Sequence, residues 1–95
     1  MTTAPEFDAV IHAPNRLQIC ALLALVDSAE FATVRDAVGV SDSVLSKHVS
    51  TLQEAGYVEI RKAPVASRVR TWLALTKAGR RAFDAHVAEL KRIVG

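Results

Sequence analysis

The sequence predicts a small α+β domain that is mostly helical and carries one β-hairpin. Apolar residues recur at helical spacing through most of the chain. Two runs that alternate apolar and polar residues flank a short loop near residue 66. The length of 95 residues is that of one domain, residues 1–95. The expected order is helix, helix, short extended piece, helix, helix, hairpin and helix.

The composition predicts an aliphatic core and excludes several classes of protein. Hydrophobic residues make up 51% of the chain and aromatic residues 5%. Charged residues make up 23%, close to the globular average, which excludes wholesale disorder. We expect a cytoplasmic protein with no membrane partner, because there is no signal peptide and no apolar run of about 18 residues. The single Cys20 excludes an intrachain disulfide and a zinc site made only of cysteines.

The first two helices are expected at residues 6–12 and 15–26. Pro14 separates them and suits the first turn of the second helix, where its missing N–H costs nothing. The second helix is apolar almost all round, so it must be covered on all sides. A second subunit is one source of that cover.

A short extended piece is expected at Phe31 and Ala32. Thr33 is then predicted to cap a short helix, with Asp36 three residues later as a variant of the capping box. Gly39 is a natural residue to end that helix, because it tolerates a left-handed backbone.

The next helix is predicted to begin after Ser41 and to end near Ala55. Ser41 is a favourable N-cap, and the carboxylate of Asp42 complements the helix dipole in the first turn. One stripe of this helix is apolar and is expected to face the core, with His48 beside it: Val44, Leu45, Val49 and Leu52.

Two alternating runs, residues 57–62 and 70–75, predict a hairpin around a loop at residues 64–68. Thr76 is expected to cap a last helix over residues 77–94. Two short helices joined at Gly39–Ser41 have the size of a helix-turn-helix, and a hairpin directly after them makes a winged helix.

Three segments carry a resemblance to a known family. They are VRDAVGVSDSVLSKHVSTLQEAGYV at 34–58, RTWLALTKAGR at 70–80 and HAPNRLQICALL at 12–23. Residues 34–58 resemble the recognition segment of bacterial winged-helix transcriptional regulators. Residues 70–80 resemble their second wing strand and the start of the helix that follows it, and residues 12–23 resemble their second helix. The closest resemblance is to the short, single-domain MarR/ArsR-like subgroup, and it covers nearly the whole chain.

The resemblance implies a homodimer that binds double-stranded DNA at a specific sequence. Two recognition helices would read a pseudo-palindrome whose half-sites lie about one helical turn apart. Repression by blocking polymerase is the simplest regulatory role. Relatives often bind a small-molecule effector between the dimer helices and the DNA-binding core, but no residue here marks such a site.

The formal net charge of +2 hides an uneven distribution. Residues 1–46 carry six acidic and two basic side chains, whereas residues 47–95 carry four acidic and ten basic ones. From Ile60 to Arg81 there are seven basic residues and no acidic one. This concentration favours a polyanionic partner, although a basic stretch more often simply forms a solvated surface.

The helix after Ser41 is predicted to enter the major groove, which admits one α-helix. Its outer side is small and polar, which lets the backbone approach the bases. For the serines the alternative is a merely solvated face, and Asp42 is interpreted first as a cap because its carboxylate repels phosphate. The predicted DNA-binding residues of this segment are Ser41, Asp42, Ser43, Ser46, Lys47 and Ser50.

Three basic residues flank the loop of the hairpin and are also predicted to contact DNA. They are expected to reach phosphates or an adjacent minor groove. The alternative is that their charge protects an edge strand from aggregation. These residues are Lys62, Arg68 and Arg70.

The first and last helices are expected to pair across a two-fold axis. Both carry apolar residues at helical spacing, and the segment of residues 17–26 is a further candidate for this interface. The predicted dimer interface consists of Phe7, Val10, Ile11, Phe83, Val87, Leu90 and Val94.

Other kinds of site are expected to be absent, with no catalytic residue, metal or cofactor. Asp84 and His86 match half of a metal site known in ArsR-type regulators, but the second half would lie beyond Gly95. We interpret His86 as a dimer-face or partly exposed residue, and His48 as a residue that packs or bonds to the backbone. Cys20 lies in the most apolar segment, so inert packing is favoured over redox sensing.

Two further classes of function remain as alternatives. A winged helix without DNA binding serves as a protein–protein interaction module, but such domains often lose the basic wing, which this chain keeps. An enzyme would need a nucleophile, base and acid in a polar cleft, and the sequence shows no such set.

Overall fold

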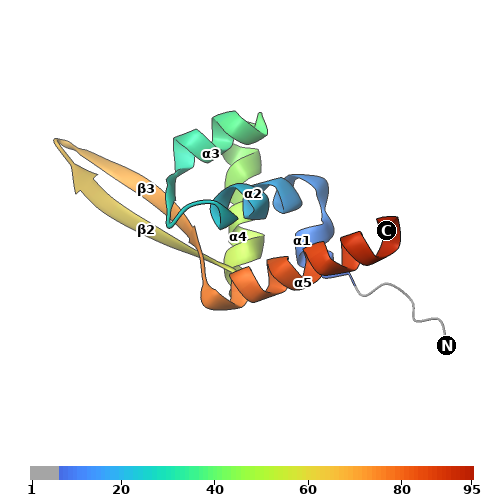
Figure 1. The fold of residues 1–95 in the computed structure, drawn as a ribbon. Helices are drawn as coiled ribbons and strands as arrows, with labels where there is room; N and C mark the ends of the chain where they lie inside the picture. The colour runs from blue at the N-terminus through green and yellow to red at the C-terminus, as the bar shows by residue number, and fades with distance from the viewer. Residues whose placement is uncertain (1–6) are drawn as a thin grey trace.

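A computed structural model describes residues 7–95 of the chain (Figure 1). Glu6, where the first helix was expected to begin, lies outside the described residues. The order of elements agrees with the prediction. The elements are α1 (Ala9–His12), α2 (Pro14–Ala24), β1 (Ala29–Glu30), α3 (Phe31–Val38), α4 (Asp42–Glu54), β2 (Val58–Val65), β3 (Arg68–Leu75) and α5 (Lys77–Val94).

The strands form one antiparallel sheet in the order β1-β3-β2. Strands β2 and β3 pair over their whole length, from Val58 opposite Leu75 to Val65 opposite Arg68. The hairpin, or wing, therefore closes with a tighter turn than the predicted loop at 64–68, through Ala66 and Ser67. It projects away from the helices (Figure 1).

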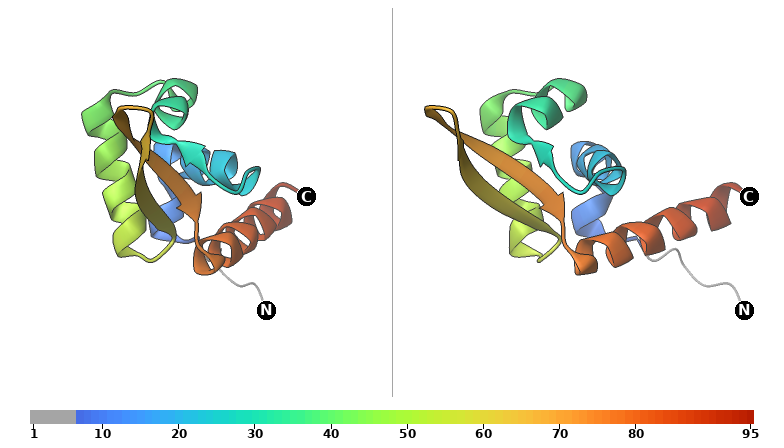
Figure 2. Two further views of the ribbon diagram at one scale, coloured as in Figure 1. Left: turned by 90° about the vertical axis from the view of Figure 1, so that its left-hand side faces the viewer. Right: turned by 60° about the vertical axis from the view of Figure 1, so that its left-hand side comes forward.

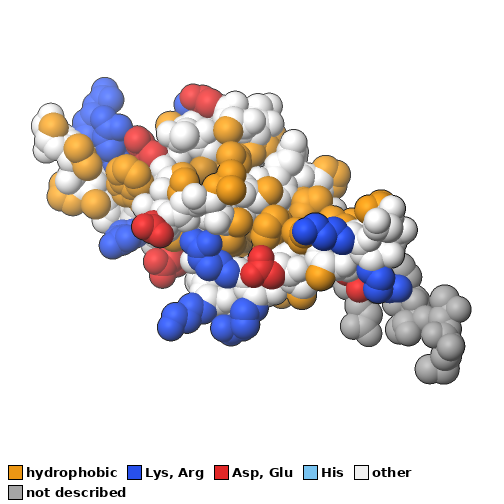
Figure 3. Space-filling view, in the orientation of Figure 1, with side chains coloured by type: hydrophobic (Ala, Val, Ile, Leu, Met, Phe, Trp, Pro, Cys, Tyr) orange, Lys and Arg blue, Asp and Glu red, His pale blue; other side chains and the backbone are white. Residues whose placement is uncertain are grey.

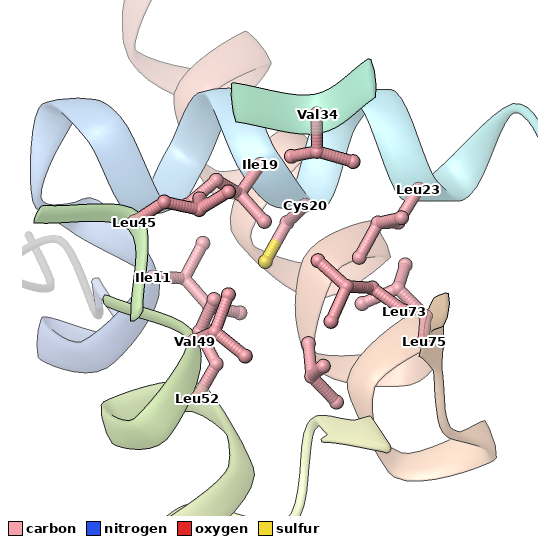
Figure 4. Packing of buried hydrophobic residues seen from close by; sticks show 11 residues of the cluster. Ile11, Ile19, Cys20, Leu23, Val34, Leu45, Val49, Leu52, Leu73 and Leu75 are labelled. Atoms are coloured by element: carbon pink, nitrogen blue, oxygen red, sulfur yellow. The ribbon is translucent and has the colours of Figure 1, made fainter. Parts of the chain in front are cut away.

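The core is aliphatic, as the composition predicted. It lies where α2, α4 and the base of the hairpin meet, and its buried cluster contains no aromatic side chain (Figure 4). Burial raises the pKa of the Cys20 thiol to about 11, which keeps it protonated and unreactive. The cluster consists of Ile11, Ile19, Cys20, Leu23, Val34, Leu45, Val49, Leu52, Val58, Leu73 and Leu75.

Three predicted helix ends are confirmed. The Ser41 hydroxyl accepts a hydrogen bond from the backbone N–H of Val44 at 3.2 Å, and the Thr76 hydroxyl accepts one from Gly79 at 2.9 Å. Gly39 ends α3 in the left-handed region, with φ of 79°. The sequence therefore placed the turn between α3 and α4 correctly.

The predicted start of α3 is wrong. The extended piece lies two residues earlier than expected, at Ala29–Glu30, and Phe31 is already helical. Glu30 is paired with Trp72 of β3, so the chain passes directly from the sheet into the helix. Thr33 therefore lies inside α3 and caps nothing, and Asp36 instead forms an ion pair with Arg35.

Helix α5 packs against the rest of the fold mainly through its first half. Its buried residues are Gly79 and His86, and the end of the helix beyond His86 extends away from the other elements (Figure 1, Figure 2). Arg80 donates hydrogen bonds to the carbonyl groups of Ala24 and Val26 at 3.3 and 2.9 Å, which ties α5 to the end of α2. None of the helices described within residues 7–95 is long and apolar enough to span a membrane.

Candidate nucleic-acid interface

Helix α4 is buried on one side and open on the other. Leu45, Val49 and Leu52 face the core. The opposite side lies at the surface of the molecule, where Figure 2 shows α4 along one edge. The exposed residues between Asp42 and Ser50 are Asp42, Ser43, Val44, Ser46, Lys47 and Ser50.

Ser41 holds the start of α4 in place. Its hydroxyl accepts the N–H of Val44 and lies 3.3 Å from the Ser43 hydroxyl. These contacts make Ser41 a positioning residue for the helix, whether or not it also touches DNA.

Asp42 is neutralised by an arginine that the sequence analysis did not single out. Arg35 of α3 donates to the Asp42 carboxylate at 2.8 Å and to that of Asp36 at 2.9 Å. Hydrogen bonds to Asp36 and Asp42 raise the pKa of Arg35 further above its already high ordinary value. The ion pair offsets the repulsion that a lone Asp42 would exert on phosphate.

A groove of about 410 Å³ runs between α4 and the wing. Its polar lining includes Asp42, Ser46, Ser50 and Lys62, which belong to the predicted DNA-binding set. Phe31 and Thr71 line the same groove and are not among the residues predicted from the sequence. Thr71 could have been found from strand register, because it lies directly opposite Lys62.

The two wing arginines occupy different environments. Arg68 lies exposed beside the turn, as expected for a residue that reaches outward. Arg70 donates twice to the Glu30 carboxylate, at 2.8 and 3.1 Å. The sequence did not predict this pair, through which the guanidinium of Arg70 holds β3 to the residue that precedes α3, and contact of Arg70 with DNA stays a prediction.

Shared lining residues connect the groove to two shallow hollows, one beside Lys47 and one beside Arg68, although strand alternation places Arg68 on the opposite face of the wing from Lys62. Ser46 and Ser50 line both the groove and a shallow hollow that contains Lys47. Phe31 and Thr71 line both the groove and a second hollow that contains Arg68. Within residues 7–95, no ion pair involves Lys47, Lys62 or Arg68.

The predicted dimer residues differ in how deeply they are buried. Ile11 is 0% exposed and belongs to the core, so its place in the predicted interface was wrong. Val10 and Phe83 are half-buried against that core. Phe7, Val87 and Leu90 are half-buried, and Val94 is 82% exposed near the end of α5.

His86 is also placed differently from the prediction. It is 1% exposed, and its Nε2 lies 3.2 Å from Nδ1 of His12, whose ring stacks on Phe7. The Nδ1 atom of His86 is buried with no hydrogen-bond partner among the described residues. Burial lowers the pKa of His86, and the neighbouring His12 lowers it further.

His48 is half-buried on the side of α4 that faces the start of α2. Its ring nitrogens lie 3.4 Å from Asn15 Nδ2 and from Arg16 Nη1, so it contacts side chains and not backbone. Burial lowers the pKa of His48, as do the charges of Arg16 and Lys47. In the part of the chain that the structure describes, no three histidine, cysteine or acidic side chains gather into a group that could hold a metal ion.

Two short helices, an open second helix and a basic wing define the winged-helix class of DNA-binding proteins. The chain belongs to the winged helix DNA-binding domain family, whose model matches residues 15–94. An uncharacterized protein of Methanocaldococcus jannaschii is 32% identical over 84 residues, which cover 88% of this chain and 91% of that one.

Solved structures share the fold. A transcriptional regulator homologue from Pyrococcus horikoshii superposes with a TM-score of 0.84 at 25% identity, over 90% of this chain and 84% of that one. The homodimeric winged helix-turn-helix DNA-binding domain Mb0332 of Mycobacterium bovis gives a TM-score of 0.74 at 21% identity, over 90% and 75%. The structural neighbours include transcriptional regulators of the MarR and ArsR families, which agrees with the resemblance found in the sequence.

Proposed function

We propose that this protein is a transcriptional regulator that binds double-stranded DNA at a specific sequence as a homodimer, and that it represses by blocking polymerase. The observation that carries the proposal is the exposed, serine-rich side of α4 together with the groove and the wing tip beside it. Lys47, Lys62 and Arg68 on this surface have no ion-pair partner among the described residues. In this arrangement α4 enters the major groove, and the cations contact the flanking phosphates.

The second half of α5 supports the homodimer. Ile93 is 48% exposed and Val94 82%, and the half-buried Leu90 lies on the same side of the helix. Figure 3 shows further hydrophobic side chains over α2 and between α2 and α5. A contiguous exposed apolar face on a soluble domain is typical of an association surface. Two α4 helices related by a two-fold axis would then read a pseudo-palindromic operator.

Salt dependence of DNA binding tests the docking surface. We expect Lys47→Ala and Lys62→Ala each to weaken binding to all duplexes. Each substitution should also flatten the dependence of log K on log salt by about one unit, because one phosphate contact is lost. The measurement is a gel shift or fluorescence titration with random and genomic duplexes at several salt concentrations.

Arg61→Ala is the matched control for Lys62→Ala. The two residues are neighbours on β2, and alternation along the strand places Arg61 on the other face, away from the groove. Both substitutions remove one positive charge, but only Lys62→Ala should change the salt slope. Equal slopes in the two variants would contradict the proposed surface, and no binding at all would favour an interaction module.

The dimer is tested on α5 itself. Leu90→Asp should shift the protein from dimer to monomer in sedimentation or light scattering, because a charge would be buried in the apolar interface. Ala88→Asp is the control, since Ala88 is exposed on the opposite side of the same helix. A Leu90→Asp protein that stays dimeric would place the interface elsewhere. The small-molecule effector stays a prediction.

A further inference from the structure

The outer side of α4 carries one large apolar residue among polar ones. Val44 is 39% exposed, although its spacing predicted a place in the core stripe. It precedes the buried Leu45, and one residue corresponds to about 100° of rotation around a helix, which moves Val44 to the flank. It shares a shallow hollow with Ser43, Ser46, Lys47 and Ser50.

The position of Val44 is fixed by the helix cap. It is the third residue of α4, and its backbone N–H donates to the Ser41 hydroxyl. A β-branched side chain in a helix has one strongly preferred rotamer, so its two methyl groups hold a constant place. The N-terminal residues of a recognition helix are those that reach base edges.

An exposed valine on the outer side of α4 can be buried only against an apolar group of a partner. The association face of α5 does not supply it, because α4 and the free half of α5 lie on different sides of the molecule (Figure 2). Of the groups that base pairs present in the major groove, the 5-methyl group of thymine is the apolar one. The other groups are hydrogen-bond donors and acceptors, which a valine cannot satisfy.

We propose that Val44 is a specificity-determining residue whose methyl groups contact the 5-methyl group of a thymine in each half-site. This inference rests on the proposed function, since it requires α4 to lie in the major groove. Ser43, Ser46 and Lys47 supply polar contacts beside it, and Val44 distinguishes thymine from the other bases through shape and burial.

The test is a double-mutant cycle between protein and DNA. Duplexes are first selected from a random pool with the wild-type protein. Each thymine of the selected site is then replaced by deoxyuridine, which removes the 5-methyl group alone. Wild-type affinity should fall about fourfold at one position per half-site, because burying one methyl group contributes about that factor. Val44→Ala should bind more weakly and make no distinction between thymine and deoxyuridine at that position.

Val65→Ala is the matched control. Val65 lies on the wing and is 42% exposed, close to the exposure of Val44, and its variant should keep the wild-type distinction. Alanine at position 44 favours a helix, and circular dichroism confirms the fold. If Val44→Ala still distinguishes the two bases, or no thymine responds in the wild type, the inference fails while the proposed function stands. If no sequence is enriched, the proposed function itself fails.

Discussion

Residues of the same type differ here by the partners that the fold gives them. Arg68 and Arg70 are two apart on β3 and look equivalent in the sequence. Arg68 is exposed beside the turn, whereas both hydrogen bonds of Arg70 go to Glu30. Arg68 is therefore available to bind a phosphate group, whereas Arg70 is already paired with the carboxylate of Glu30.

Substitution of the two arginines should therefore separate stability from binding. Arg70→Ala should lower the free energy of unfolding by about 1 kcal/mol, because the pair is partly exposed, and should leave the salt slope of DNA binding unchanged. Arg68→Ala should leave stability unchanged and flatten the slope by about one unit. Urea denaturation and salt titration measure the two effects. If Arg70→Ala also changed the salt slope of DNA binding, Arg70 would have to leave Glu30 and contact a phosphate in the complex with DNA.

At the scale of elements, the junction between the wing and α5 depends on a close approach of backbones. The carbonyl group of Tyr57, just before β2, accepts the N–H of Thr76 at 3.0 Å. A Cβ atom on Gly79 in the first turn of α5 would lie 2.1 Å from that same carbonyl oxygen. Glycine is therefore required so that α5 can pack at the base of the hairpin.

Gly79→Ala should destabilise the protein by about 1–3 kcal/mol or more, because backbone atoms cannot move aside as a flexible side chain can. Gly39→Ala is the comparison, since nothing lies within 4 Å of its Cβ position and only its φ of 79° opposes the change. That substitution should cost about 1 kcal/mol. Thermal unfolding of both variants measures the difference. Equal losses would mean that the Tyr57 contact relaxes at no cost.

At the scale of the whole molecule, histidines link the packing of the helices to pH. His86 of α5 faces His12 of α1, and His48 of α4 faces the start of α2. The folded state lowers the pKa of both His86 and His48, chiefly through burial. Asp8, which caps α1, opposes the shift of His86 without reversing it.

A lowered histidine pKa fixes the sign of the pH dependence. Above the ordinary histidine pKa near 6.5, the imidazole is neutral in both the folded and the unfolded protein, so its protonation does not reduce the free energy of unfolding. As the pH falls through and below that value, the unfolded chain takes up protons first, so the free energy of unfolding decreases. Each of these histidines adds at most about 1.4 kcal/mol per pH unit to that slope.

We therefore expect stability to fall between pH 7 and pH 5, and His86→Gln to flatten this fall. Chemical denaturation at a series of pH values and one protein concentration measures it, because a dimer's stability depends on concentration. His48→Gln serves as an independent second variant, since His48 lies on a different element. An unchanged pH profile in His86→Gln would contradict the role assigned to the pair with His12.

Local chemistry alone determined the order of elements and several helix ends. The hydroxyls of Ser41 and Thr76 and the backbone freedom of Gly39 act within a few residues, so their roles could be predicted from neighbours in sequence. The aliphatic core followed from composition, and the exposed polar side of α4 from helical spacing. The family resemblance, and with it the winged helix, rested on the same local segments.

Only the tertiary structure decided which side chains already have partners. Glu30 lies 40 residues from Arg70 and His12 lies 74 residues from His86, so no local pattern could pair them. Pairing of Glu30 with β3 also overrode the capping box expected at Thr33, and packing of α1 on the core removed Ile11 from the predicted interface. Ion pairs and burial depend on distance in space, and the fold sets that distance.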